Sequence, residues 1–208
     1  MGRIRIVIPF YNEFESVKPG LRSLLGSGIE YDFIPVQGPR IGCNRNAGVN
    51  NLRSNKTRQS AVEGYSHFLF LDSDISFAPA HVHMALKADV PVFAFPYFRH
   101  ENDGLYQVGE LAEGKPRIEK RYGKADRGLR EVTFVGGGFL LVKREIFGAI
   151  GFPWFHESIL EVGPESFSVG SDVMFSHKVR EAGISITCDL DHVVPHRLRR
   201  KSDFNVGL

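Results

Sequence analysis

Apolar runs that alternate with helix-patterned segments are the feature that most limits the fold of this 208-residue chain. The runs are short and rich in Val, Ile, Phe and Leu, as buried strands are. This β-α-β-α order predicts an α/β fold, with a mostly parallel central sheet covered by helices on both faces. The predicted strands are 3–10, 31–36, 66–71 and 91–95, and the predicted helices are 13–25, 44–52 and 79–88.

The second half of the chain begins with a segment of a different kind. Residues 99–130 are rich in glycine and charge and show little periodicity. Such a segment in an α/β enzyme is typically a mobile loop or a small hairpin near the active site, here centred on 104–128. We therefore expect one domain, 1–208, with halves 1–98 and 99–208. Beyond the loop we predict strands at 132–142 and 184–188, and helices at 143–150 and 171–182, with Gly183 as a C-cap.

Composition excludes several classes of protein. A net charge of +2 is too small to indicate a nucleic-acid partner, although residues 196–201 are basic. The two cysteines have no spacing typical of a zinc site or a disulfide framework, so a reducing compartment is the default. The longest apolar runs are about half of the ~20 residues that a membrane span needs. We expect a soluble cytoplasmic protein with no transmembrane segment.

The strongest functional signal is a pair of carboxylates at the end of a strand. Asp72 and Asp74 flank Ser73 directly after the apolar run 68–71. Open α/β sheets bind ligands at the carboxyl ends of their strands. Alternate residues of a strand share a face, so the two acids can converge on a hard cation such as Mg²⁺ or Mn²⁺, which prefers oxygen ligands. Two exposed acids that begin a turn are the structural alternative.

Six segments, taken together and in this order, resemble family 2 glycosyltransferases and their GT-A relatives, including compact phage- and virus-encoded ones. Three segments have short motifs: Pro9-Phe10-Tyr11-Asn12-Glu13 is similar to P-x-Y-N-E, Arg45-Asn46-Ala47-Gly48 to R-N-x-G, and Asp72-Ser73-Asp74 to D-x-D. The run 135–144 resembles the family's glycine-rich strand, and the run 170–175 is similar to G-E-D-x-x-F. The last segment, Val194-Pro195-His196, ends in a histidine as the family's does.

The resemblance implies a GT-A fold and a glycosyltransferase activity (EC 2.4). The enzyme would move a sugar from a nucleotide-diphosphate sugar, such as a UDP- or GDP-sugar, to a hydroxyl of a glycan or other acceptor. Mn²⁺ or Mg²⁺ would be held by Asp72, Asp74 and His196, with Asp72 contacting ribose or a metal-bound water. Asp172 would be the general base of an inverting transfer, which takes the proton of the acceptor hydroxyl. An acid at a helix start can also be an N-terminal dipole partner or cap.

The resemblance also implies contacts to the donor and the acceptor. Tyr11 could stack on the base, Arg40 and Arg45 could balance pyrophosphate charge, and Gly137 could let the backbone approach a ligand. Trp154 and Tyr97 are candidate acceptor contacts, although core packing is an alternative for the tryptophan. The residues expected to bind the nucleotide sugar are Pro9, Tyr11, Glu13, Arg40, Arg45, Asp72, Ser73 and Gly137.

The chain departs from the family at two places. Residues 35–39 (Pro-Val-Gln-Gly-Pro) stand where the family has acids that help to read uracil, and Ser171 stands where it has an acid before the base. Two other functions stay open. One is a phosphatase of the haloacid-dehalogenase type, in which Asp72 would be the nucleophile and Asp74 the acid/base. The other is a domain that binds nucleotide sugar or glycan without catalysis. If a phage or virus encodes the chain, the expected location is the host cytoplasm.

Overall fold

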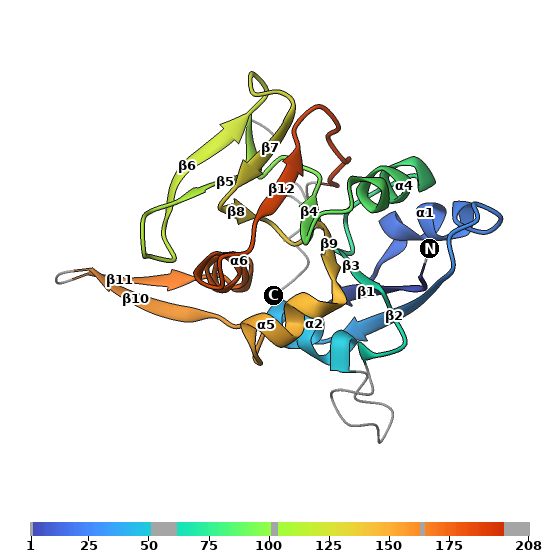
Figure 1. The fold of residues 1–208 in the computed structure, drawn as a ribbon, viewed down its shortest axis with the longest axis horizontal. Coiled ribbons are helices and arrows are strands. Elements are labelled where there is room, and N and C mark those ends of the chain that lie inside the picture. The colour runs from blue at the N-terminus through green and yellow to red at the C-terminus, as the bar shows by residue number, and fades with distance from the viewer. Residues whose placement is uncertain (1, 51–61, 101–103, 163–164, 198–208) are drawn as a thin grey trace, which may run out of the picture.

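A seven-stranded mixed sheet forms the centre of the molecule. The structure is a computed structural model that describes residues 2–50, 62–100, 104–162 and 165–197. The strand order is β2-β1-β3-β9-β4-β12-β7 (Figure 1). The pairings run β1, β2, β3, β4 and β12 in one direction and β7 and β9 in the other, so the predicted mostly parallel sheet is confirmed. The strands are β1 (Ile4–Phe10), β2 (Tyr31–Gln37), β3 (His67–Leu71), β4 (Val92–Ala94), β7 (Leu129–Val132), β9 (Phe139–Lys143) and β12 (Ile186–Asp189).

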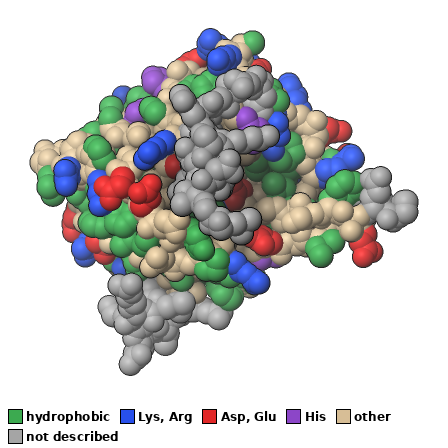
Figure 2. All heavy atoms as spheres, turned by 180° about the vertical axis from the view of Figure 1, so that it is seen from behind, with side chains coloured by type: hydrophobic (Ala, Val, Ile, Leu, Met, Phe, Trp, Pro, Cys, Tyr) green, Lys and Arg blue, Asp and Glu red, His purple; other side chains and the backbone are tan. Residues whose placement is uncertain are grey.

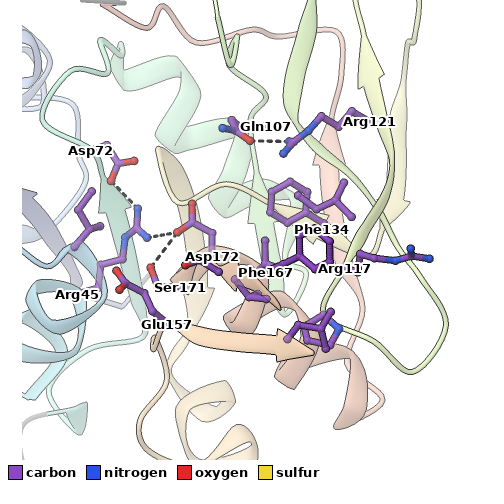
Figure 3. A pocket seen from close by; sticks show the side chains of 18 of the residues that line it. Arg45, Asp72, Gln107, Arg117, Arg121, Phe134, Glu157, Phe167, Ser171 and Asp172 are labelled. Carbon is purple, nitrogen blue, oxygen red and sulfur yellow. Dashed lines mark hydrogen bonds and ion pairs between the residues drawn. The ribbon is translucent and has the colours of Figure 1, made fainter. Parts of the chain in front are cut away.

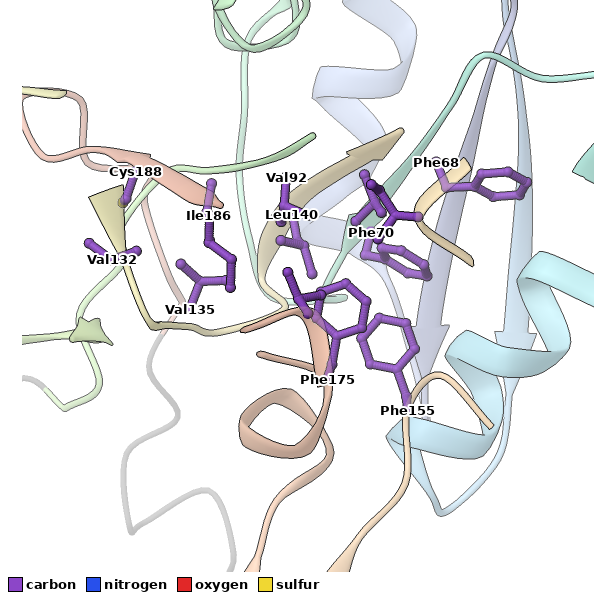
Figure 4. Close-up of a cluster of buried hydrophobic side chains, with 14 of the residues drawn as sticks. Phe68, Phe70, Val92, Val132, Val135, Leu140, Phe155, Phe175, Ile186 and Cys188 are labelled. Carbon is purple, nitrogen blue, oxygen red and sulfur yellow. The ribbon is translucent and has the colours of Figure 1, made fainter. Parts of the chain in front are cut away.

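Helices cover both faces of this sheet, because its central strands are apolar on both sides. In β3, Phe68 and Phe70 pack into one core cluster and Leu69 and Leu71 into the other, as the twofold repeat of a strand requires. Figure 4 shows the first cluster, where the rings of Phe155 and Phe175 stack with centroids 4.5 Å apart. The helices α2 (Ile41–Asn50), α5 (Arg144–Ile150) and α6 (Ser171–Glu181) lie on this face, and α1 (Lys18–Ser23) and α4 (Pro79–Ala88) on the other.

Two predicted elements differ from the structure. The helix expected at 13–25 is a 3-10 turn, η1 (Glu15–Val17), followed by the short α1, which begins beside Pro19. The single strand expected at 132–142 is wrong: β7, β8 (Phe134–Val135) and β9 are separate, and β8 leaves the main sheet. The break coincides with Gly136–Gly138, whose missing side chains let this backbone approach Tyr97 and Arg45.

Residues 104–128 contain a hairpin, one of the two forms expected for this segment. β5 (Leu105–Leu111) pairs with β6 (Ile118–Gly123) on one side and with β8 on the other. Glu110 ties the hairpin to the body, because its carboxylate accepts a hydrogen bond from the Thr133 hydroxyl at 2.7 Å; within the hairpin it accepts one from the Tyr122 hydroxyl at 2.5 Å. Arg180 of α6 also donates to the carbonyl oxygen of Ala112 at 3.1 Å.

A second hairpin, β10 (Ser158–Val162) and β11 (Glu165–Val169), has no counterpart among the predicted elements. It extends beside α6 in Figure 1. None of the helices within the described ranges is long and apolar enough to cross a membrane. Figure 2 shows apolar side chains interspersed with acidic and basic ones on one face of the molecule. The end of the predicted helix 44–52 and most of the basic segment 196–201 lie outside the described residues.

Candidate functional site

A buried arginine joins three of the sequence motifs. Arg45 lies on α2 and its side chain is 1% exposed. Its Nη1 donates to Oδ1 of Asp172 at 2.6 Å, and its Nη2 donates to Oδ1 of Asp72 at 2.7 Å (Figure 3). Asp72 directly follows β3, and Asp172 lies in the first turn of α6. The fold therefore brings the two candidate carboxylates to one guanidinium, which we call the Arg45 clamp (Arg45, Asp72 and Asp172).

The glycine-rich segment closes over the Arg45 clamp. A Cβ at Gly137 would lie 2.2 Å from Nη2 of Arg45, so any other residue here would force the guanidinium to shift away from its two carboxylates. The backbone N–H of Gly137 donates to Oδ2 of Asp172 at 3.1 Å. The Ser171 hydroxyl donates to Oδ1 of Asp172 at 3.2 Å. Both oxygens of Asp172 thus have fixed partners, and the carboxylate is held in one orientation.

The charges of the Arg45 clamp are coupled. Burial opposes the charge on Arg45, but Asp172 and Asp72 together raise its pKa above the ordinary value. Burial also opposes the charge on Asp172, but Arg45 and the N–H of Gly137 hold the pKa of this carboxyl below its usual value. Burial raises the pKa of Asp72, because the attraction of Arg45 is partly offset by repulsion from Asp172 and Asp74. Asp172 is therefore the more firmly ionised of the two acids.

Asp74 does not join the Arg45 clamp but contacts His196 instead. The chain turns immediately after β3, and the N–H of Ile75 donates to the carbonyl oxygen of Asp72 at 3.1 Å. Asp74 then meets His196, with Oδ2 and Nε2 3.3 Å apart. Nδ1 of His196 lies 2.8 Å from the carbonyl oxygen of Phe98 and must carry the hydrogen there, so Nε2 is the nitrogen that faces Asp74.

The predicted metal ligands are only partly assembled. Within the described residues, no group of three or more His, Cys, Asp or Glu side chains is close enough to hold a metal ion. Asp72 accepts a hydrogen bond from Arg45, whereas Asp74 meets His196, so the convergence of the two acids on one cation stays a prediction. Burial opposes a charge on His196, but Asp74 raises its pKa, so a divalent cation held by this pair would have to replace the proton on Nε2.

Two clefts meet at the residues that follow β3. A cavity of about 830 Å³ is lined by the Arg45 clamp, by both hairpins and by the start of α6. A smaller cleft of about 360 Å³ is lined by Ser73, Asp74, Glu13, Arg197 and their neighbours. The sequence interpretation missed most of the large cavity's wall, which includes Gln107, Ile118, Arg121, Phe134, Leu160 and Phe167. The alternation of Ser and apolar residues at 166–169 was the available signal for the second hairpin.

Of the remaining predicted donor contacts, Glu13 lines the smaller cleft, and Pro9, Tyr11 and Arg40 line neither cleft. Pro9 is buried in β1, and the Tyr11 side chain, just beyond the strand, is 65% exposed. Glu13 is exposed on the smaller cleft. Arg40 is exposed immediately before α2, where its carbonyl oxygen accepts a hydrogen bond from the N–H of Asn44 at 3.0 Å. Arg45, by contrast, has both terminal nitrogens on carboxylates, and a contact with pyrophosphate stays a prediction.

The two candidate acceptor contacts are buried. Trp154 is 5% exposed, donates its Nε1–H to the carbonyl oxygen of Phe147 at 2.7 Å, and packs against the Phe147 and Phe152 rings. It has the core-packing role that was its alternative, and it lines neither cleft. Tyr97 is 6% exposed and packs edge-on to His196, with ring centroids 5.2 Å apart. It does not line either cleft.

Among the comparisons with known proteins, only the comparison with solved structures gives matches. No protein-family model and no curated protein sequence matches this chain. A crystal structure of A197 from STIV matches with a TM-score of 0.61 and 18% identity, over 96% of this chain and 87% of that one. A Drosophila β-1,4-galactosyltransferase 7 mutant in complex with manganese, UDP-Gal and xylobiose matches with a TM-score of 0.55 and 14% identity, over 98% of this chain and 74% of the other.

A third solved structure is GalNAc-T7 with UDP, GalNAc and Mn²⁺. It matches with a TM-score of 0.59 and 12% identity over 97% of this chain, which spans only 44% of that protein. At these identities the likeness concerns the backbone, and it agrees with the sheet and the flanking helices described above. The chain therefore has the fold of the GT-A glycosyltransferases.

Proposed function

We propose that this protein is a glycosyltransferase that moves a sugar from a nucleotide-diphosphate sugar to an acceptor hydroxyl. The observation that carries the proposal is the Arg45 clamp: a buried guanidinium holds Asp72 and Asp172, which are 100 residues apart in the sequence, on the wall of one large cavity. A buried cation between two partly exposed acids stabilises little by itself compared with apolar packing, so a role in the site explains it better.

Asp172 is the proposed general base. Its carboxylate is ionised, oriented by three donors and 29% exposed, so it can still reach a molecule in the cavity. It would accept the proton of the acceptor hydroxyl while the oxygen attacks the anomeric carbon and the nucleoside diphosphate leaves. Arg45 would be a positioning residue, because it fixes the distance between the base and Asp72.

The donor is proposed to lie across the ridge formed by Asp72, Ser73 and Asp74. Asp74 and His196 would hold Mn²⁺ or Mg²⁺, and the cation would offset the charge of the diphosphate. Asp72 would contact the ribose, and Gly137 would leave room for the sugar. The base and ribose would be bound by residues at the ends of β1 and β2, namely Pro9, Tyr11, Glu13 and Arg40.

A donor screen tests the proposal. UDP-, GDP-, CMP- and dTDP-sugars, each with Mn²⁺ or with EDTA, should include one that raises the melting temperature only with the metal, since a ligand of the native state stabilises it. Asp74→Asn should abolish that shift, whereas Asp89→Asn, a matched change at an exposed ion pair with Lys143, should keep it. Tight donor binding in EDTA that Asp74→Asn does not change would refute the metal site.

Product analysis separates the proposed function from its two alternatives. A transferase with an acceptor releases nucleoside diphosphate, and a phosphatase releases inorganic phosphate instead. A binding domain shows the metal-dependent thermal shift and releases neither. Both products should therefore be measured in parallel, with and without candidate acceptors.

A further inference from the structure

The large cavity has a charged end and another end where apolar side chains lie between Arg117 and Arg121. The Arg45 clamp forms the charged end. The other end lies between the two hairpins, and Figure 3 shows Phe134 and Phe167 there, to one side of Asp172, with Asp72 to the other side. We call this end the apolar slot; its side chains are Ile118, Phe134, Leu160, Phe167 and Val169.

The register of the second hairpin builds one wall of the apolar slot. Leu160 of β10 and Phe167 of β11 are directly opposite partners, so their side chains lie on the same face, and both line the cavity. Ile159, the neighbour of Leu160, points to the other face, is 72% exposed and does not line the cavity. Phe167 and Ile159 are therefore apolar residues of the same hairpin on opposite faces, and only Phe167 lines the cavity.

The opposite wall is held rigid. Phe134 is 2% exposed, and the guanidinium of Arg121 lies 5.2 Å from the centre of its ring. Nη1 of Arg121 donates to Oε1 of Gln107 at 2.7 Å, which fixes the arginine on the ring. Phe167, on the other wall, is 47% exposed. An aromatic ring that remains half-exposed inside a concave site is typical of a surface that binds an apolar group.

We propose that the acceptor carries an apolar ring next to the hydroxyl that it offers, and that this ring binds in the apolar slot between Phe134 and Phe167. The inference rests on the proposed function, because it assigns the hydroxyl to Asp172 at the charged end. A cavity of about 830 Å³ lies within the range of roughly 300–1,000 Å³ in which proteins bind ligands of several rings. The side chains of Ile118, Leu160, Phe167 and Val169 offer a sugar hydroxyl no hydrogen-bond partner, whereas Gln107, Arg117 and Arg121 line the neighbouring part of the same cavity.

A pair of ligands that differ only in the ring tests this inference. The probes are 4-nitrophenyl β-D-glucoside and methyl β-D-glucoside, and their binding is measured by calorimetry with Mn²⁺ and UDP present. The aryl glucoside should bind the wild type at least about tenfold more tightly, as expected for burial and stacking of one ring. Phe167→Ser should remove most of that difference, and Ile159→Ser should keep it.

The outcomes separate this inference from the function on which it rests. Equal binding of the two glucosides by a protein that binds UDP and Mn²⁺ would overturn the inference alone. An aryl preference that Phe167→Ser leaves intact would also overturn it, because the ring would then bind elsewhere. Failure of every nucleotide to bind would overturn the proposed function and the acceptor role of the slot together. UDP affinity that is the same in both serine variants and the wild type would show that the variants are folded.

Discussion

Replacing Asp172 by asparagine is the sharpest test of the Arg45 clamp. The amide has nearly the same size as the carboxylate, and in an ordinary helix cap it would serve as well. In this site it cannot. Oδ1 accepts from Arg45 at 2.6 Å and Oδ2 accepts from the N–H of Gly137 at 3.1 Å, so whichever position the NH₂ group takes, it faces another donor. Arg45 also loses one of its two anionic partners.

The size of the effect follows from these contacts. Removing one partner of a buried ion pair costs about 3–5 kcal/mol of unfolding free energy. Arg45 keeps Asp72, and Asp172 is 29% exposed, so water and the second carboxylate recover part of this cost. We expect a loss of about 2 kcal/mol, which lowers the melting temperature of a protein of this size by about 4–8 °C. Turnover should fall by about 10²–10⁴-fold, the usual contribution of a positioned base.

Thermal and urea unfolding of the two proteins measure the stability change, with Asp89→Asn as the surface control. The dependence of the unfolding free energy on pH, below neutral pH, adds a second criterion. The pKa of Asp172 is lowered in the folded state, so its stabilisation is fully present above its unfolded pKa, near 4, and is lost as the pH falls through the folded value. The stability gap between wild type and Asp172→Asn should therefore be full at pH 7 and shrink below about pH 4. An unchanged melting temperature together with wild-type turnover would refute both roles of Asp172.

The remaining predictions concern the parts around the clamp. Gly137→Ala should destabilise the protein by more than about 2 kcal/mol, because its Cβ would meet Arg45, whereas Gly148→Ala in α5, with open space around it, should stabilise it by about 0.5–1 kcal/mol. Arg45→Lys keeps the charge but offers one nitrogen for two carboxylates, so melting temperature and turnover should both fall; wild-type values would contradict the clamp. If residues 104–128 act as a lid, donor binding should slow hydrogen exchange in β6, an edge strand, more than in β5, which is paired on both sides. Equal protection with and without donor would mean that the segment is structural.

The strands and helices that sequence patterns locate well are those whose signals are local. α4 begins and ends where predicted, at Pro79 and Ala88, because proline favours the first turn and the apolar spacing is regular. β1 and β3 were found within one residue, since buried strands are continuous apolar runs. The hairpin β10–β11 was not predicted, because its short strands mix Ser and Glu with apolar residues and resemble a loop.

The ion-pair partners of charged residues cannot be predicted from local sequence patterns, because the fold decides which side chains meet. The sequence marks Arg45, Asp72 and Asp172 as candidates, but their motifs are up to 127 residues apart and the pattern does not say which side chains meet. The prediction that Arg45 balances pyrophosphate rested on its charge alone, because the sequence does not show the two acids that the fold brings to it. Trp154 shows the same limit: an aromatic ring beside other aromatics fits a sugar site or a core, and only packing distinguishes them.

The turn after β3 explains how one short motif can serve two clefts. A strand that continued to residue 74 would place Asp72 and Asp74 on one face, where both could ligate a single cation. The turn closed by Ile75 separates them, so that Asp72 joins Arg45 at the large cavity and Asp74 joins His196 beside the smaller cleft. A donor lying across this ridge would have its diphosphate on the Asp74 side and its sugar on the Asp172 side. Under the proposed function, the separation of the two acids would then set where the transferred sugar meets the acceptor.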